Sequence, residues 1–338
     1  MAMRKFIIRG FLYLLPFIVA ILTVYIVDPY YLFTGEDQFD EQKYLVGYSY
    51  DQGRRYKIFT YFNNPTDNII LGASEINIIS EHNIPEEGWH SLSYGGAPLQ
   101  ESLRMYWVAQ NKHKLKKVII APEFIKYYNA ISSTTGDPYY ANFTWEVSQS
   151  AKAIEIYDNK LDYFVDKYTI ESTLQCIKSL VGDKSSRSKP QGSKEDFWQS
   201  QLDYAEQQYS GDIFPEKKQE IWALFSAIKE DAERRGVEIR IVLPIQHIDL
   251  LRLEFQDVVY ETYKEYIAFL TKTFGEIYYM AFSEDISNNQ DCFSDPFHCI
   301  MEEYYVDKLF GKHRITPLNE EKAMEFLDFI RRYLSNHE

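Results

Sequence analysis

Short apolar runs alternate along the chain with longer stretches whose apolar residues recur at helical spacing. The short runs predict buried strands at residues 68–71, 89–94, 117–121, 237–243 and 276–282. The longer stretches predict helices at residues 98–114, 145–180, from 195 onward, 215–235, 254–274 and 318–334. Because strands and helices alternate in this way, we predict an α/β fold with a parallel sheet and helices on both of its faces.

The first apolar segment differs from the others because it contains no charged residue. It covers residues 10–27, and a helix of this length spans about 27 Å, close to the hydrocarbon thickness of a bilayer. Arg4, Lys5 and Arg9 precede it, which predicts a single-pass membrane anchor with a cytoplasmic N-terminus and an extracytoplasmic remainder. A cleaved signal peptide is the alternative, although no small-x-small cleavage site follows Val27.

These patterns predict a chain with one large domain behind an N-terminal anchor. The expected parts are a cytoplasmic tail at 1–9, a transmembrane helix at 10–27, a linker segment at 28–64 and an α/β domain at 65–338. Within that domain, residues from about 130 to 235 are mostly helical in pattern, and we expect them to form an insertion that serves as a lid or a partner surface.

Composition narrows the classes of function that the chain can have. The 338 residues are enough to bury a large core, and a net charge of −14 argues against a partner that is a nucleic acid. Three cysteines are too few for a disulfide scaffold. Cys292 and Cys299 are close enough in sequence to close a small loop, and the sequence leaves open whether they are bonded or reduced.

The loops that follow the predicted strands contain a nucleophile, a base and a carboxylate. In parallel sheets, ligands bind beyond the carboxyl ends of the strands. Ser74 comes directly after the first predicted strand, and Asp295 and His298 follow the last, three residues apart. This spacing lets the carboxylate orient the imidazole, whose other nitrogen then acts as a base toward the serine. The alternatives are a helix N-cap at Ser74 and an exposed loop histidine at 298.

Two further sets of residues were weighed as parts of a site. His247 follows the fourth predicted strand, so it lies at the same sheet edge and is a candidate for lining the pocket or binding substrate. A zinc site built on Cys292, His298 and Cys299 is disfavoured because their spacing matches no standard zinc motif. The sequence therefore indicates neither a metal nor a cofactor.

In these blocks the sequence resembles the SGNH (GDSL-like) hydrolase superfamily. The string LGASEINIIS, together with Asp-x-x-His near the end of the chain, is similar to the membrane-anchored DltD-like proteins of teichoic-acid D-alanylation and to exported SGNH-like proteins that O-acetylate surface polysaccharides. The resemblance implies a flavodoxin-like three-layer α/β/α sandwich, with Ser74 as nucleophile, His298 as base and Asp295 as orienting residue. It also implies an oxyanion glycine at Gly95 or Gly96.

The chain departs from the superfamily pattern at two positions. Ala73 stands where the esterases have aspartate, and the nearest match to the third-block asparagine, Asn129, lies eight residues past Ala121. The resemblance implies acylation of a cell-surface glycopolymer, by D-alanylation or O-acetylation, beside a membrane-bound O-acyltransferase. An esterase for such polymers is one alternative, and a non-catalytic binding or scaffold partner of the acyltransferase is another.

Overall fold

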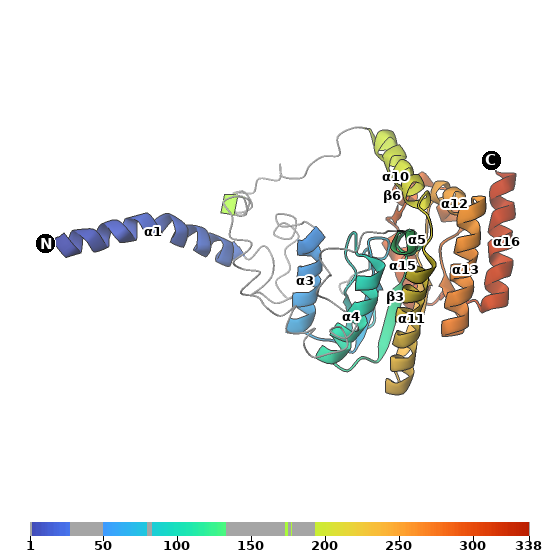
Figure 1. Ribbon diagram of the computed structural model, residues 1–338, viewed down its shortest axis with the longest axis horizontal. Coiled ribbons are helices and arrows are strands. Elements are labelled where there is room, and N and C mark those ends of the chain that lie inside the picture. The colour runs from blue at the N-terminus through green and yellow to red at the C-terminus, as the bar shows by residue number, and fades with distance from the viewer. Residues whose placement is uncertain are drawn as a thin grey trace. The chain divides into compact units, whose positions relative to one another are not determined.

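The computed structural model of the protein describes residues 2–27, 50–79, 83–132, 173–174, 177 and 193–337 (Figure 1). The chain forms two compact units, one of Met1–Asn64 with Glu155–Gln191 and the other of Pro65–Ile154 with Gly192–Glu338. The first unit contains α1 (Ala2–Val27) and α3 (Tyr50–Asn63). The second contains every strand of the described residues, and all predicted site residues lie in it.

A five-stranded parallel sheet forms the centre of the second unit. Its strands are β1 (Asn68–Gly72), β2 (Trp89–Ser91), β3 (Lys117–Ala121), β4 (Glu238–Leu243) and β5 (Tyr278–Tyr279). They lie in the order β2-β1-β3-β4-β5, and every neighbouring pair is parallel. The predicted α/β fold with a parallel sheet is therefore confirmed, and the strand order is one of the two common doubly wound orders. In the register, Gly72 of β1 pairs with Ala121 of β3.

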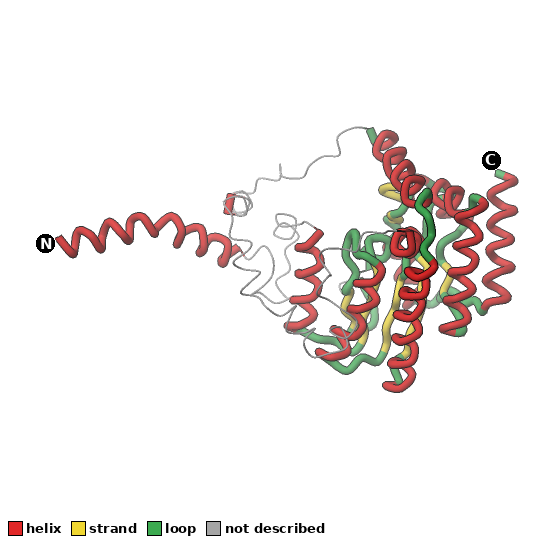
Figure 2. The backbone as a smooth tube through the Cα atoms, viewed as in Figure 1, coloured by secondary structure: helices red, strands yellow, loops and turns green. Residues whose placement is uncertain are grey.

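Helices cover the sheet on both faces. The described helices of this unit are α4 (Leu99–Lys112), α5 (Phe124–Ser132), α10 (Lys194–Tyr209), α11 (Pro215–Arg235), α12 (Ile248–Glu254), α13 (Asp257–Phe274), α14 (Glu284–Ser287), α15 (Glu302–Phe310) and α16 (Glu320–Asn336). Successive strand residues point to opposite faces, and Ile69, Ile70 and Leu71 are all fully buried, so neither face of β1 meets solvent. Figure 2 shows α4 and α11 side by side in front of the strands.

Most helix predictions agree with the structure, and the exceptions have local causes. Helix α11 has the predicted bounds and ends at Gly236, whose φ of 71° lies in the left-handed region that suits a glycine C-cap. The single helix predicted at 254–274 is wrong at its start, because α12 ends at Glu254 and α13 begins only at Asp257. The helix predicted at 145–180 lies outside the described residues except at 173–174 and 177, which are helical.

A β-hairpin after β5 packs against the sheet. Its strands β6 (Phe293–Asp295) and β7 (His298–Cys299) are antiparallel. Phe293 and Cys299 belong to the same buried cluster as Ile70 and Val242 of the sheet, which fixes the hairpin to the core. Cys292 and Cys299 are free thiols, so the disulfide that the sequence left open is not formed between them. We call residues 293–299 the dyad hairpin.

The N-terminal segment is helical, as its apolar sequence predicts. Helix α1 contains Pro16, and most of its side chains between residues 10 and 26 are exposed. In the described part of the chain, the search for membrane-spanning helices finds none that is long and apolar enough to cross a bilayer. The transmembrane helix predicted at 10–27 is therefore not confirmed.

Candidate active site

The dyad hairpin brings Asp295 and His298 together. His298 Nδ1 lies 2.7 Å from both carboxylate oxygens of Asp295. The backbone amides of Phe297 and His298 donate to the same carboxylate at 3.0 and 3.2 Å. These four contacts close within one tight turn, so the sequence spacing of three residues is sufficient to form the predicted contact.

The charge state of this pair sets the histidine tautomer. Burial raises the pKa of Asp295, but the hydrogen bond from His298 and its charge outweigh burial, and the pKa lies below its usual value. Asp295 is therefore ionised at neutral pH and only accepts hydrogen bonds, so His298 Nδ1 carries a proton and Nε2 has a free lone pair. The His298 side chain is one-third exposed, whereas that of Asp295 is buried. A base of this kind is accessible to a substrate.

Ser74 lies where β1 ends, in a turn that we call the nucleophile turn, residues 73–77. Ser74 is half-buried, and the Asn77 amide donates to its carbonyl oxygen at 3.3 Å. In the residues that the structure describes, no hydrogen bond joins Ser74 Oγ to His298 and the Ser74 amide donates to no acceptor. Hydrogen bonds between nucleophile and base are often longer in the absence of substrate than during reaction.

The carboxylate of Glu123, which the sequence pattern does not single out, binds the backbone of the nucleophile turn. The backbone amide of Glu75 donates to Glu123 Oε1 at 2.7 Å, and the Ala73 backbone also hydrogen-bonds to this side chain. Glu123 lies two residues after the end of β3, in the loop that leads to α5. It is 2 % exposed. The charge of His298 acts on Glu123, so this carboxylate also lies near the dyad.

Three buried carboxyl groups lie together beneath this turn. Burial, followed by the charges of Glu123 and Glu254, raises the pKa of Glu75 well above its usual value. Burial also raises the pKa of Glu123 despite the opposing charge of Lys126 and the bond from the Glu75 amide, and it raises the pKa of Glu254 to about 7. Glu75 makes no hydrogen bond through either carboxyl oxygen. The pKa values of the three groups are therefore shifted in the same direction, which favours their protonated forms.

The predicted oxyanion glycines lie beside the nucleophile turn. The amide of Ala97 donates to the Tyr94 carbonyl at 3.3 Å, which closes a turn with Gly95 and Gly96 at its centre, and Gly96 has a φ of 74°. Tyr94 and Ala97 pack against Ala73 in a small buried cluster. This contact places the glycine turn next to Ser74, where a backbone amide can serve as an oxyanion donor.

Asn129 and His247 have structural partners. Asn129 lies on α5 and its amide nitrogen donates to Gln208 of α10. His247 is buried and caps α12, with its Nδ1 accepting from the Asp249 amide at 3.2 Å. The His247 backbone amide donates to the Pro296 carbonyl at 3.2 Å, so the loop after β4 is joined to the dyad hairpin. The substrate-binding roles predicted for these two residues stay predictions.

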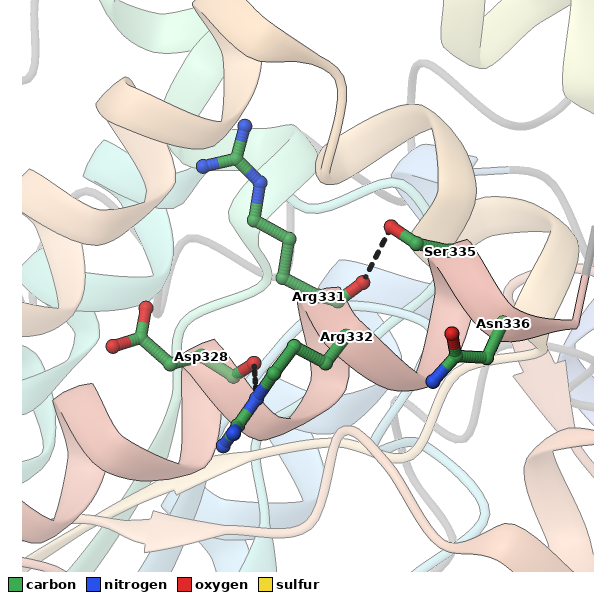
Figure 3. Close-up of a pocket in the computed structure, with 5 residues that line it drawn as sticks. All are labelled: Asp328, Arg331, Arg332, Ser335 and Asn336. Carbon is green, nitrogen blue, oxygen red and sulfur yellow. Dashed lines mark hydrogen bonds between the residues drawn. The ribbon is translucent and has the colours of Figure 1, made fainter.

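Two hollows in the described residues lie away from the predicted site residues, and one of them is lined by Arg104, Glu220, Ala223 and Leu224. Figure 3 shows a hollow at the C-terminal helix that contains none of the predicted site residues; it is lined by Asp328, Arg331, Arg332, Ser335 and Asn336. The two arginine side chains point in different directions (Figure 3). Arg331 pairs with Asp257 at 3.3 Å. Across the described ranges, no group of three or more His, Cys, Asp or Glu side chains is arranged to hold a metal ion.

Comparison with known proteins adds no family assignment. No protein-family model matches the chain, and a search of curated proteins finds no sequence similar to it. The resemblance to SGNH hydrolases therefore rests on the sequence motifs alone.

Proposed function

We propose that the protein is an SGNH-type serine acyltransferase-like enzyme that carries an acyl group on Ser74. The observation that carries this proposal is the Asp295–His298 pair, in which one imidazole nitrogen is fixed by both carboxylate oxygens. The position of Ser74 at the end of β1 and the strand order 2-1-3-4-5 support the flavodoxin-like sandwich that such enzymes have. A carboxylate that fixes the protonated Nδ1 of a histidine leaves its Nε2 able to accept a proton from a serine hydroxyl.

The proposed reaction has two steps. His298 Nε2 takes the proton of Ser74 Oγ, the oxygen bonds to the carbonyl carbon of the acyl donor, and the protonated histidine returns its proton to the leaving group. In the second step, His298 takes the proton of an acceptor hydroxyl, whose oxygen bonds to the acyl carbon. The bond from that carbon to Ser74 Oγ then breaks, and the protonated His298 returns its proton to Ser74 Oγ. The Ser74 amide and the glycine turn at 95–96 are the proposed donors to the oxyanion.

The proposed acceptor is a hydroxyl of a cell-surface glycopolymer, and the proposed acyl group is D-alanyl or acetyl. This part rests on the sequence resemblance and on the charge asymmetry around residues 10–27, which favours an extracytoplasmic domain at the cell membrane. A membrane-bound O-acyltransferase is the proposed partner that supplies the acyl group. Water in place of the polymer hydroxyl would make the same site an esterase.

A non-catalytic scaffold is the second candidate function. It is favoured by a specific observation, that among the described residues no hydrogen bond joins Ser74 Oγ to His298. A binding module would keep the fold and the hairpin without an activated serine. The two candidates therefore differ in the reactivity of one hydroxyl group.

Fluorophosphonate labelling of the purified full-length protein separates the two candidates. We expect the wild type to be labelled at Ser74, with labelling abolished in Ser74→Ala and in His298→Ala at unchanged circular dichroism. Ser200→Ala is the matched control, because this serine is exposed on α10 and should not affect labelling. An unlabelled, demonstrably folded wild type would exclude the enzyme and favour the scaffold.

A further inference from the structure

The loop after β3 reaches the nucleophile turn through one buried side chain. Glu123 accepts the Glu75 amide at 2.7 Å and also bonds to the backbone of Ala73. These two residues flank Ser74, whose own amide donates to no acceptor in the described part of the chain. The carboxylate thus binds the amide that follows the nucleophile, while the Ser74 amide stays available for an oxyanion.

Glu123 itself is fixed by the core around it. Tyr266 donates its hydroxyl to the Pro122 carbonyl at 3.2 Å, which anchors the backbone just before Glu123. The residue just after it, Phe124, lies within a buried aromatic group, with its ring 4.5 Å from that of Tyr263. Because the residues before and after Glu123 are packed in the core, its carboxylate has a fixed position. A turn that binds to this carboxylate is therefore held in a fixed position too.

The contact between Glu123 and the turn is short and buried. The Glu75 amide lies 2.7 Å from Glu123 Oε1, and because the carboxyl group is buried, water cannot easily replace it as the acceptor. Glu75, whose own carboxyl oxygens have no hydrogen-bond partner, takes part through its backbone amide. This hydrogen bond therefore ties the loop after β3 to the nucleophile turn.

We propose that Glu123 is a positioning residue that holds the nucleophile turn in a single conformation through its carboxylate. The conformational part of this inference stands by itself, and its consequence for reactivity rests on the proposed function. A mobile turn would misplace Ser74 Oγ relative to His298, and a displacement of about 1 Å can reduce a rate by about 10²-fold.

Hydrogen exchange measured by mass spectrometry on the full-length protein tests the conformational part. In Glu123→Ala, we expect the peptide covering residues 72–79 to exchange about tenfold faster or more, as follows from leaving a buried amide without its acceptor. Glu123→Gln keeps an acceptor oxygen for the Glu75 amide and should restore slow exchange. Glu254→Gln is the matched control, because it neutralises another fully buried carboxyl that accepts from Tyr209 and Gln246 instead of from this turn.

The labelling rate of Ser74 provides the second measurement. We expect Glu123→Ala to be labelled about 10²-fold more slowly than the wild type, Glu123→Gln to recover most of the rate, and Glu254→Gln to label normally even where its melting temperature falls.

Unchanged exchange of residues 72–79 in Glu123→Ala would overturn the inference. So would an equal acceleration in Glu254→Gln, because that result would reflect general loosening of the core. A wild type that does not label at all counts against the proposed function alone, since the exchange comparison is independent of catalysis.

Discussion

The dyad hairpin and the nucleophile turn belong to one candidate site, but contacts of different range hold them in place. In the hairpin, the bonds that fix Asp295 to His298 join residues no more than three positions apart. In the turn, the Glu75 amide is bound by a carboxylate 48 positions away, and Ala73 packs against a loop that follows another strand. The bonds that orient the base are therefore local in sequence, although the hairpin packs on the sheet, whereas the bond that holds the nucleophile turn joins distant parts of the chain.

The same contrast holds for their electrostatics. The hairpin contains a carboxylate whose pKa is lowered by the histidine that it binds, despite partial burial. The turn lies over three carboxyl groups whose pKa values are raised because they are fully buried. The hairpin thus contains a charged pair that is partly exposed, and the turn lies over buried carboxyl groups. Because the pKa shifts of the two sets have opposite signs, a change of pH alters their contributions to stability in opposite directions.

The largest effect is expected from a substitution in the dyad hairpin, whose orienting bonds are local in sequence. Asp295→Asn keeps an oxygen for the backbone amides, but it cannot hold the imidazole with a proton on Nδ1. We expect the second-order rate of Ser74 labelling by a fluorophosphonate to fall by about 10⁴-fold, the size of effect known for the loss of an orienting carboxylate in serine triads. Circular dichroism should show an unchanged fold.

The chain provides a matched control for this substitution in a second Asp–His pair. Asp307 lies 3.0 Å from Nδ1 of His313, but this pair is exposed and lies outside the candidate site. Asp307→Asn should therefore label at the wild-type rate. Labelling of Asp295→Asn at a rate near that of the wild type would mean that the dyad is not used as a base.

The next prediction concerns how the raised pKa of Glu254 and the lowered pKa of Asp295 change stability with pH. The pKa of Glu254 is raised by burial to about 7, so the folded state binds a proton that the unfolded state has released above its ordinary pKa. The free energy of unfolding should consequently fall as the pH rises from about 4.5 to about 7, by about 3 kcal/mol for this group alone. Asp295 has the opposite sign, because its lowered pKa gives stability that is lost only when the pH falls below about 4.

Urea unfolding between pH 4.5 and 7.5 measures this slope. Glu254→Gln should reduce the slope but not abolish it, because Glu75 and Glu123 contribute with the same sign through their own raised pKa values. Glu265→Gln removes an exposed carboxyl paired with Lys218 and should leave the slope unchanged. If stability rises with pH over this interval in the wild type, the buried carboxyls are not protonated in the folded state.

The range of the contacts also explains how much of the molecule could be predicted from the sequence. The sheet was predictable because buried strands are continuous apolar runs bounded by Gly or Pro, as at 68–71 and 117–121. Strand β5 was overestimated, since the apolar run at 276–282 contributes only Tyr278–Tyr279 to the sheet. Helix α5 was not predicted, because it is a single short element in which six of nine residues are buried, so the polar face of an amphipathic helix is weak.

The candidate site was predictable to a similar extent and for the same reason. The Asp295–His298 contact could be inferred from a spacing of three residues, and the position of Ser74 followed from the strand before it. Glu123 could not be inferred, because a single glutamate in an apolar segment has no pattern and its partner turn lies in another part of the sequence. Its position two residues after a predicted strand was the available indication.

The smallest expected effect tests whether the nucleophile turn depends on close packing at the end of β1. A Cβ atom on Gly72 would lie 2.5 Å from Ile76 Cγ2 and 3.1 Å from the Ala121 carbonyl oxygen. Both neighbours are buried, so Gly72→Ala should lower the free energy of unfolding by about 1–3 kcal/mol through overpacking and should also slow the labelling of Ser74.

Gly236→Ala is the comparison, because its cost comes from a φ of 71° with no atom within 4 Å of the new Cβ. It should lower stability by about 1–2 kcal/mol and leave labelling unchanged. If both variants lose stability but label at the wild-type rate, the reactivity of Ser74 does not depend on the packing at the end of β1. That result would contradict the view that long-range contacts position the nucleophile turn.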